Sequence, residues 1–185
     1  FDNNKPVLRS EAQRFLFDKL IIACGAFSKK LTDQAGEKIP LDTERGYHVH
    51  FKGHDHLLSR PVIFLNRGFG ITPMEQGLRV VGTVEFGGLD NPPSKKRITN
   101  LVNNAKYLFP ELEKHEDEWL GFRPTLPDFL PVIGPSKKYK NLFYSFGHHH
   151  LGWTLGAISG KIVAGIIAKE NTNLDLSAYS SSRFN

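Results

Sequence analysis

The chain has 185 residues, with 24 Lys and Arg against 19 Asp and Glu, a formal net charge of +5, 17 Gly and 11 Pro. This composition is typical of a globular protein and excludes collagen, a coiled coil and an intrinsically disordered chain. Cys24 is the only cysteine, which excludes a disulfide scaffold and favours a reducing, cytoplasmic setting. The first residue is Phe1 and the only methionine is Met74, so we expect further sequence upstream.

The positive charge raises the question of a nucleic-acid partner, because cationic patches attract phosphates. The basic residues form separate short clusters beside expected turns and helix starts, at residues 29–30, 95–97 and 137–140. We therefore expect solvated surface there and no nucleic-acid partner. The most apolar stretch, residues 151–168, contains Lys161, Ser159 and four glycines, so we expect a buried helix and no transmembrane segment.

Residues 20–24 form a short apolar run that Gly25 closes. Such a run is typical of a strand buried on both faces, and the turn after it leads to Ser28 and a short helix. This order indicates α/β structure. Cys24 then lies in an apolar strand, where we expect an inert core thiol.

After Pro40 the sequence alternates between apolar and polar residues. Tyr47, Val49 and Phe51 alternate with polar residues, and in residues 79–86 the expected core face consists of Val80, Gly82, Val84 and Phe86. Period two over these lengths predicts half-buried antiparallel strands. Residues 61–66, with a turn at 68–70, complete an expected strand-turn-strand meander.

A helix is predicted from its cap at Ser94 to Phe109, because the apolar positions between them follow helical spacing and Pro110 ends it. Beyond Trp119 the chain is rich in proline, and we expect it to be irregular. A strand at residues 142–146, a loop at 147–152 and a helix at 153–169 follow.

The order of these elements predicts an α+β fold, in which an antiparallel-sheet domain is inserted into an α/β layer. We place the α/β layer in residues 1–40 and 121–170. The antiparallel sheet and its helix are placed in residues 41–120, and residues 171–185 are expected to form a surface tail.

The loop at residues 147–152 is the first candidate site. Gly147 and Gly152 bound it between a strand and a helix. Glycines let the backbone approach a ligand, and a helix start offers unpaired N–H groups and a partial positive charge to an electron-rich group. A purely structural turn is the alternative.

Arg123 is the second candidate, in the sequence Gly-Phe-Arg-Pro. Pro124 disfavours a helical backbone at Arg123, so the guanidinium is presented from an extended segment. A planar fork held in this way suits two-point binding of a carboxylate. A surface arginine or an internal ion pair is the alternative.

Seven of the eight histidines lie in two groups, at residues 48–56 and 148–150. Neutral imidazoles bind divalent metals, which raises a metal site. We expect none, because His48 and His50 form the polar face of the amphipathic strand and no acidic residue or cysteine stands at a recognised ligand spacing.

In combination these segments resemble the FAD-dependent D-amino acid oxidase and dehydrogenase superfamily, which includes glycine oxidase. Residues 20–28 are similar to the strand and A-x-G-x-x-S turn of its flavin domain, residues 45–47 to the entry of its substrate domain, and residues 82–85 to its G-T-x-E strand. Residues 121–134 and 147–161 resemble its G-x-R-P-x-x-P-D-x-x-P-x-I-G and G-H-x-x-x-G-x-T-L-x-x-x-S-G-K signatures.

The resemblance implies FAD as the cofactor and an amino acid or amine as the substrate, a D-amino acid or a glycine-like amine, whose CH–NH bond is oxidised by hydride transfer. It implies that Arg123 holds the substrate carboxylate and that His150 stands where glycine oxidase-like members have a second arginine. Tyr47 is either a further hydrogen-bond partner of the substrate or a core aromatic residue. The implied cofactor-binding residues are Cys24, Gly25, Gly147, His148, Leu151, Gly152, Trp153 and Thr154.

The resemblance also implies that the chain is the C-terminal half of such an enzyme, because the glycine-rich turn for the FAD pyrophosphate is absent from its sequence. We therefore expect the chain by itself to hold no stable FAD. The electron acceptor is either oxygen or a respiratory carrier, and association with the periphery of the inner membrane stays open. A metal-dependent hydrolase that uses the histidines and a non-catalytic binding relic of a flavoprotein are the alternatives.

Overall fold

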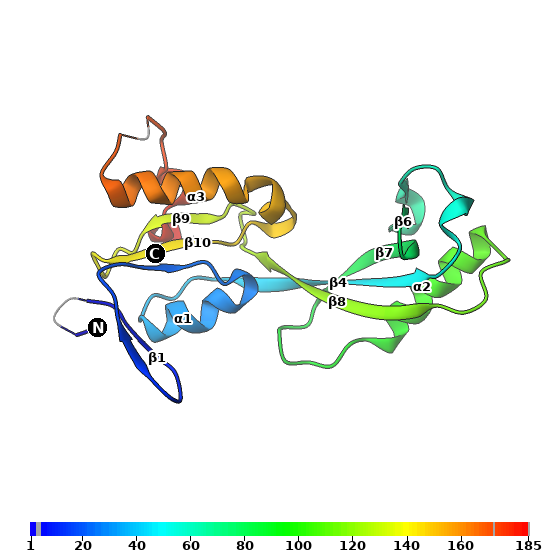
Figure 1. Cartoon of the computed structure of the whole chain (residues 1–185), viewed down its shortest axis with the longest axis horizontal. Helices are drawn as coiled ribbons and strands as arrows, with labels where there is room; N and C mark the ends of the chain where they lie inside the picture. Colours follow the sequence, from blue (N-terminus) through cyan, green and yellow to red (C-terminus); the bar gives the residue numbers. More distant parts are fainter. Residues whose placement is uncertain (3–4, 172, 185) are drawn as a thin grey trace. The chain divides into compact units, whose positions relative to one another are not determined.

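The computed structural model describes residues 1–2, 5–171 and 173–184. The chain divides into two compact units (Figure 1). Unit one consists of Phe1–Asp42 and Arg123–Asn185, and unit two consists of Thr43–Phe122. The divisions expected from the sequence, after residues 40 and 120, lie close to these.

The main sheet of unit one has the strand order β3-β10-β9. Its central strand β10 (Leu142–Phe146) runs parallel to β3 (Leu20–Ile22) and antiparallel to β9 (Val132–Pro135). Helix α3 (Gly152–Ala168) packs along β9 and β10 (Figure 1). The predicted strand at 142–146 and the helix that follows it are therefore confirmed.

Further elements of unit one come from its N-terminal segment. Helix α1 (Ser28–Gln34) follows β3 as predicted, after a short 3₁₀ turn at Gly25–Phe27. Strands β1 (Val7–Arg9) and β2 (Arg14–Leu16) form a separate antiparallel hairpin that the sequence pattern did not predict.

Most described residues of the C-terminal segment of unit one are exposed or half-buried, but the segment is also anchored to the sheet. Two 3₁₀ turns, Ser177–Tyr179 and Ser181–Phe184, contact β9, and the side chain of Phe184 packs on the core of this unit. Ser181 is buried, and its hydroxyl donates a hydrogen bond to the carboxylate of Glu37 at 3.4 Å. The polar composition of the segment thus reflects buried hydrogen bonds as well as solvent exposure.

Buried Glu37 ties this segment to the sheet. Its carboxylate also accepts hydrogen bonds from the hydroxyls of Tyr144, at 2.8 Å, and Ser136. Burial, with the neighbouring carboxylate, raises the pKa of Tyr144. Tyr144 therefore stays a hydroxyl donor, which a buried carboxylate requires.

Two expectations for the first strand are wrong. The strand ends at Ile22, so Cys24 lies outside it and is exposed. Ile21 is 45% exposed, although a strand buried on both faces was expected. The side chain of Ile21 lines an open space beside α3, so that face of β3 is not fully covered.

Two strands occupy the proline-rich region that we expected to be irregular. They are β8 (Glu116–Thr125) and β9. β8 is an edge strand of the sheet of unit two, and an edge strand tolerates Pro124 because one side of its backbone needs no ladder partner. Arg123 therefore has the extended backbone that its proline neighbour predicts.

Unit two is built on a five-stranded sheet with the order β5-β6-β7-β4-β8. The strands are β5 (Val62–Phe64), β6 (Phe69–Met74), β7 (Gly77–Phe86), β4 (Asp42–Phe51) and β8. The pairs β5–β6, β6–β7 and β7–β4 are antiparallel. The predicted antiparallel meander is thus confirmed, although its turn ends at Gly68, before Phe69 and Gly70.

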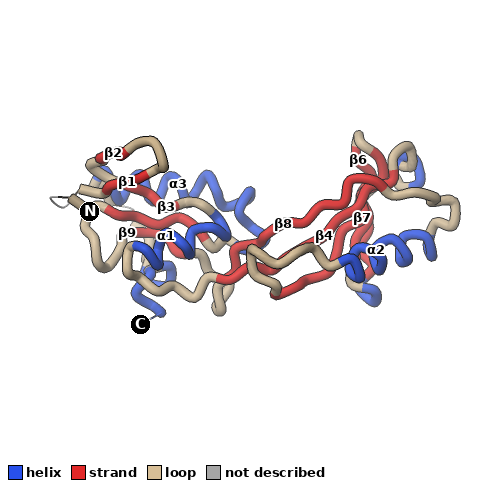
Figure 2. Tube along the Cα trace, turned by 90° about the horizontal axis from the view of Figure 1, so that it is seen from below, coloured by secondary structure: helices blue, strands red, loops and turns tan. Residues whose placement is uncertain are grey.

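Helix α2 (Lys95–Leu108) covers one face of this sheet (Figure 2). Ser94 stands at the predicted N-cap position, although its side chain makes no capping hydrogen bond. The helix and the strands share a buried apolar core whose members include Tyr47, Val49, Phe51, Ile71, Leu78, Val80, Ile98 and Leu101.

The predicted alternation along β7 fails beyond Gly82. The β4–β7 register shifts between Arg45 and Tyr47, and Thr83 on the facing strand has a positive φ of 62°. A bulge of this kind reverses which face each later side chain occupies. As a result Val84 and Phe86, expected in the core, are 45% and 70% exposed.

Helix α3 is not the buried helix that we expected. By length and composition alone, His149–Ala168 would be able to cross a membrane, with a mean hydropathy of 1.5, and only 11% of it is buried. One such helix is weak evidence for a span, and α3 packs on the sheet along one side. Its other side carries exposed residues, of which Trp153 is the most exposed.

Candidate functional site

The candidate site lies where two parallel strands end. β3 and β10 are neighbouring parallel strands, so their carboxyl ends meet at the same edge of the sheet. Gly25 follows β3 with a φ of +55°, and Gly147 follows β10 with a φ of +83°. Two of the predicted cofactor-binding segments are thus brought to one edge by the fold.

Gly147 is required by its surroundings as well as by its backbone. A Cβ at this position would lie 2.5 Å from Cδ1 of Leu126. Leu126 is fully buried, so it has no space to move away. The turn therefore needs glycine both for its left-handed conformation and for close packing.

A single 3₁₀ turn, His149–Leu151, leads from Gly147 into α3. The first residues of the helix, Gly152, Trp153 and Thr154, are exposed, and its first turn has no acidic side chain. The N–H groups at the start of a 17-residue helix carry a partial positive charge. This end of α3 therefore suits an electron-rich group.

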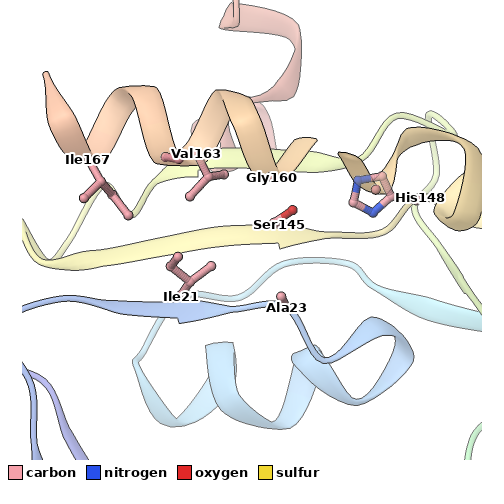
Figure 3. A pocket seen from close by; sticks show the side chains of 9 residues that line it. Ile21, Ala23, Ser145, His148, Gly160, Val163 and Ile167 are labelled. Carbon is pink, nitrogen blue, oxygen red and sulfur yellow. The ribbon is translucent and has the colours of Figure 1, made fainter. Parts of the chain in front are cut away.

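A cavity of about 590 Å³ runs beside this turn, between α3 and the strands β3 and β10 (Figure 3). Its lining is mainly apolar and comes from Ile21, Ala23, Ser145, His148, Gly156, Gly160, Val163, Ala164 and Ile167. A Cβ at Gly156 or Gly160 would meet no atom within 4 Å, so the helix leaves this side open.

His148 closes one end of the cavity (Figure 3). Its Nε2 lies 2.9 Å from the hydroxyl oxygen of buried Ser159. Burial lowers the pKa of His148, so the ring is neutral at physiological pH and forms its hydrogen bond without charge. The sequence motif pointed to His148, but only the fold shows its partner on α3.

Cys24 and Leu151 lie at the rim of the site. Cys24 is exposed, and its N–H donates a hydrogen bond to the hydroxyl of Ser28 at 3.1 Å. Leu151 is 52% exposed, and its N–H closes the 3₁₀ turn on the carbonyl of His148 at 2.8 Å. The exposed thiol replaces the inert core thiol that the sequence indicated.

Tyr47 lies in the core of unit two rather than on an open surface. It is 1% exposed, and its hydroxyl donates to Glu85 and accepts from the N–H of Ser94 at 3.0 Å. Both bonds lie within unit two. This placement favours the core role over the substrate contact, the two alternatives that the sequence left open.

Arg123 and His150 are placed as follows. Arg123 is half-buried in β8, and His150 is exposed in the turn before α3, with its ring 4.2 Å from that of His149, between centroids. The roles in substrate binding implied for both residues stay predictions.

The two histidine groups belong to different units. In unit two the ring of His48 stacks on Trp119, with centroids 4.8 Å apart, and His50 is buried, contrary to its expected place on an open polar face. The Nε of Arg79 donates to Nε2 of His50 at 3.0 Å. Burial lowers the pKa of both histidines, so these imidazoles are part of the packing of the sheet.

Comparison with known proteins identifies the family. The sequence profile of the family described as FAD dependent oxidoreductase matches residues 3–166. The chain belongs to this family. Its members share the cofactor that the motifs at residues 20–28 and 147–161 implied.

Two curated relatives in the FAD-dependent oxidoreductase family extend the match. The chain is 33% identical over 180 residues to a D-amino-acid oxidase of Bradyrhizobium diazoefficiens, covering 95% of this chain and 43% of the relative. It is 32% identical over 172 residues to a D-amino acid dehydrogenase of Granulibacter bethesdensis, covering 91% of this chain and 41% of the relative. The chain thus spans less than half the length of these relatives.

Solved structures with a similar fold support the architecture. Glycine oxidase from Geobacillus kaustophilus has a TM-score of 0.85 at 28% identity, over 98% of this chain and 50% of the oxidase. L-proline dehydrogenase from P. horikoshii has a TM-score of 0.81 at 20% identity, over 99% of this chain and 51% of that protein. The second likeness, at this low identity, concerns the fold alone.

Proposed function

We propose that this chain is part of an FAD-dependent oxidoreductase that oxidises the CH–NH bond of an amino acid. The family match, with relatives named D-amino-acid oxidase and D-amino acid dehydrogenase, supports this assignment. The single observation that carries it is the sheet edge where β3 and β10 end, with its two left-handed glycines and the exposed start of α3.

The residues at this edge fit a flavin. Gly147 allows close approach of the backbone, and Gly152, Trp153 and Thr154 present the positive end of a helix without an acidic neighbour. These residues would hold the electron-rich edge of the ring system, where a helix dipole stabilises negative charge. When bound, the flavin supplies a two-electron acceptor for the hydride that leaves the α-carbon of the substrate.

Arg123 would orient the substrate. Its guanidinium projects from the extended backbone of β8, and a planar fork binds a carboxylate at two points. Fixing the carboxylate fixes the α-carbon relative to the acceptor, and such orientation is much of what the protein contributes to this kind of reaction. Oxygen and a respiratory carrier both stay open as the final electron acceptor.

The test uses the full-length protein that contains this chain. A flavin absorbance spectrum and amino acid oxidation are expected for the unchanged protein. Arg123→Ala should lower kcat/KM for a carboxylate substrate about 10-fold to several hundred-fold, because charge-assisted hydrogen bonds are lost. Arg123→Lys should recover only part of this, and Arg9→Ala, an exposed arginine of β1, should have no effect.

Two outcomes would contradict the proposal. A colourless full-length protein whose hydrolytic activity depends on a bound metal would support the hydrolase instead. Unchanged kcat/KM in Arg123→Ala, together with a lower melting temperature, would assign Arg123 to a structural ion pair.

A further inference from the structure

The 3₁₀ turn Ser181–Phe184 is hydrogen-bonded through Arg183 to the loop that precedes β9. Arg183 donates from Nε to Oδ2 of Asp128 at 2.6 Å and from Nη2 to Oδ1 at 3.2 Å. Nη2 also donates to the carbonyl of Leu130 at 2.6 Å, and Nη1 donates to the carbonyl of Ser180 at 3.0 Å. A two-point ion pair with two carbonyl contacts is a specific arrangement, which a lysine cannot reproduce.

Asp128 in turn shapes its own loop. Its Oδ1 accepts a hydrogen bond from the N–H of Leu130 at 3.1 Å, and the N–H of Phe129 closes a turn on the carbonyl of Leu126 at 3.0 Å. The hydrogen bonds from Arg183 hold the pKa of Asp128 below its usual range. The carboxylate is therefore charged across the physiological range, where it can accept the hydrogen bonds from both Arg183 and the N–H of Leu130.

This loop touches the turn before α3 at two places. Leu126 packs beneath Gly147, where a Cβ would come within 2.5 Å of it. Phe129 meets His149 edge-on, with ring centroids 4.9 Å apart. The loop thus contacts both the first residue of the turn and its middle.

The second contact joins two strained residues. Phe129 has a φ of +58° and His149 a φ of +53°, in a region that side chains other than glycine adopt rarely. Such strain persists only where the surroundings enforce it, and it gathers at functional sites. At Phe129 the enforcing groups are the turn to Leu126 and the Asp128–Arg183 pair.

We propose that Arg183 is a positioning residue for the proposed flavin site. It acts through Asp128 and Phe129 on the turn 147–151. By stabilising this turn against local opening, it holds the start of α3 in the position that the cofactor needs. The proposal rests on the proposed function only for the identity of the ligand, since every contact in the path lies within unit one. No contact with substrate or flavin is assigned to Arg183.

The first test measures amide hydrogen exchange in the full-length protein that contains this chain. Arg183→Ala should speed exchange at Leu130 and also at Leu151, whose N–H closes the turn on His148, by about tenfold or more, because local opening no longer breaks charge-assisted hydrogen bonds. The amides of β10 should be unaffected. Arg14→Ala, which removes the surface pair with Asp2, is the matched control and should change neither site.

The variant Phe129→Gly tests whether the effect on the turn passes through the ring contact between Phe129 and His149. The alternative is that the whole loop around Asp128 has become less stable. Glycine adopts the left-handed conformation without strain, so the Asp128 loop should keep its slow exchange at Leu130. Exchange at Leu151 should still accelerate, because the ring that contacts His149 is gone. Equal acceleration at Leu151 and throughout β10 in Arg183→Ala, or no change at Leu151 in either variant, would overturn the proposal.

The second test measures FAD binding by the full-length protein. Arg183→Ala, Arg183→Lys and Asp128→Asn should each raise the dissociation constant for FAD about tenfold and shift the flavin absorbance band, while Arg14→Ala should do neither. If the unchanged protein binds no FAD, the proposed function fails, and the exchange experiment still decides the positioning role. An unchanged dissociation constant in all three variants of a protein that does bind FAD would refute the positioning role at that site.

Discussion

The hydroxyl of Tyr47 donates a hydrogen bond to Oε2 of Glu85 across the bulge between β4 and β7, at 2.5 Å. The bulge brings Glu85 to this position, because regular alternation would place its side chain on the opposite face. The same carboxylate lies 3.4 Å from Nε of buried Arg45 and 3.4 Å from Nε of Arg97 at the start of α2. One acidic side chain thus joins β4, β7 and α2.

Tyr47→Phe should lower the free energy of unfolding by about 1–3 kcal/mol, because Glu85 and the N–H of Ser94 each lose a hydrogen-bond partner. Urea denaturation of the chain measures this. We expect KM of the full-length protein to change little. A large rise in KM at unchanged stability would instead return Tyr47 to the substrate site.

Gly87→Ala should destabilise unit two by about 1–3 kcal/mol through overpacking. A Cβ at Gly87 would lie 2.7 Å from Nη1 of Arg45, and Arg45 is only 1% exposed and cannot swing into solvent. The control is a double-mutant cycle with Arg45→Met, measured by thermal melting. The losses of unfolding free energy in the two single variants should sum to more than the loss in the double variant. The reason is that the methionine has no guanidinium for the added Cβ to displace. Strict additivity would show that the glycine is needed for another reason.

Gly160→Ala should stabilise the chain by about 0.5–1 kcal/mol, because alanine is the better helix former and the added Cβ meets no atom within 4 Å. Gly156→Ala, on the same side of α3, should add a similar amount. Melting temperatures of the two single variants and the double variant check this. A loss of stability would mean that another molecule packs on this side of α3 in solution, such as a second copy of the chain.

Unfolding should become easier as the pH falls from about 6.5 to about 4, before most carboxylates are protonated. The pKa of His48 is lowered from 6.5 to about 4, mainly by burial and to a smaller extent by the positive charge of Arg79. Between these values the unfolded chain binds a proton that the folded chain does not, so stability is complete above about pH 6.5 and is lost as the pH falls through this window. Burial lowers the pKa of His50 and His148 as well, and these groups act in the same direction.

The variant His48→Gln should therefore reduce, but not abolish, the slope of unfolding free energy against pH in this window. Denaturant titrations at half-unit pH steps measure the slope. An identical slope for His48→Gln and the unchanged chain would contradict the role of burial at this ring.

The sequence by itself determined the local elements of this protein. The alternation at residues 47–51 and the helical spacing behind Ser94 each describe contacts with one neighbouring layer, and a periodic pattern records which side faces that layer. The motifs at residues 20–28, 121–134 and 147–161, in their order, determined the family. They are visible in the sequence because particular backbone turns need glycine or proline at fixed positions.

Tertiary structure alone decided the features that depend on partners distant in the chain. The bulge that turns Glu85 toward Tyr47 needs the register of β4 against β7, and no pattern within β7 records it. Arg183 and Asp128 are 55 positions apart, and neither stands in a periodic segment that would pair them. Such contacts arise from the packing of whole elements, so the residues that shape the turn before α3 became visible only in the folded chain.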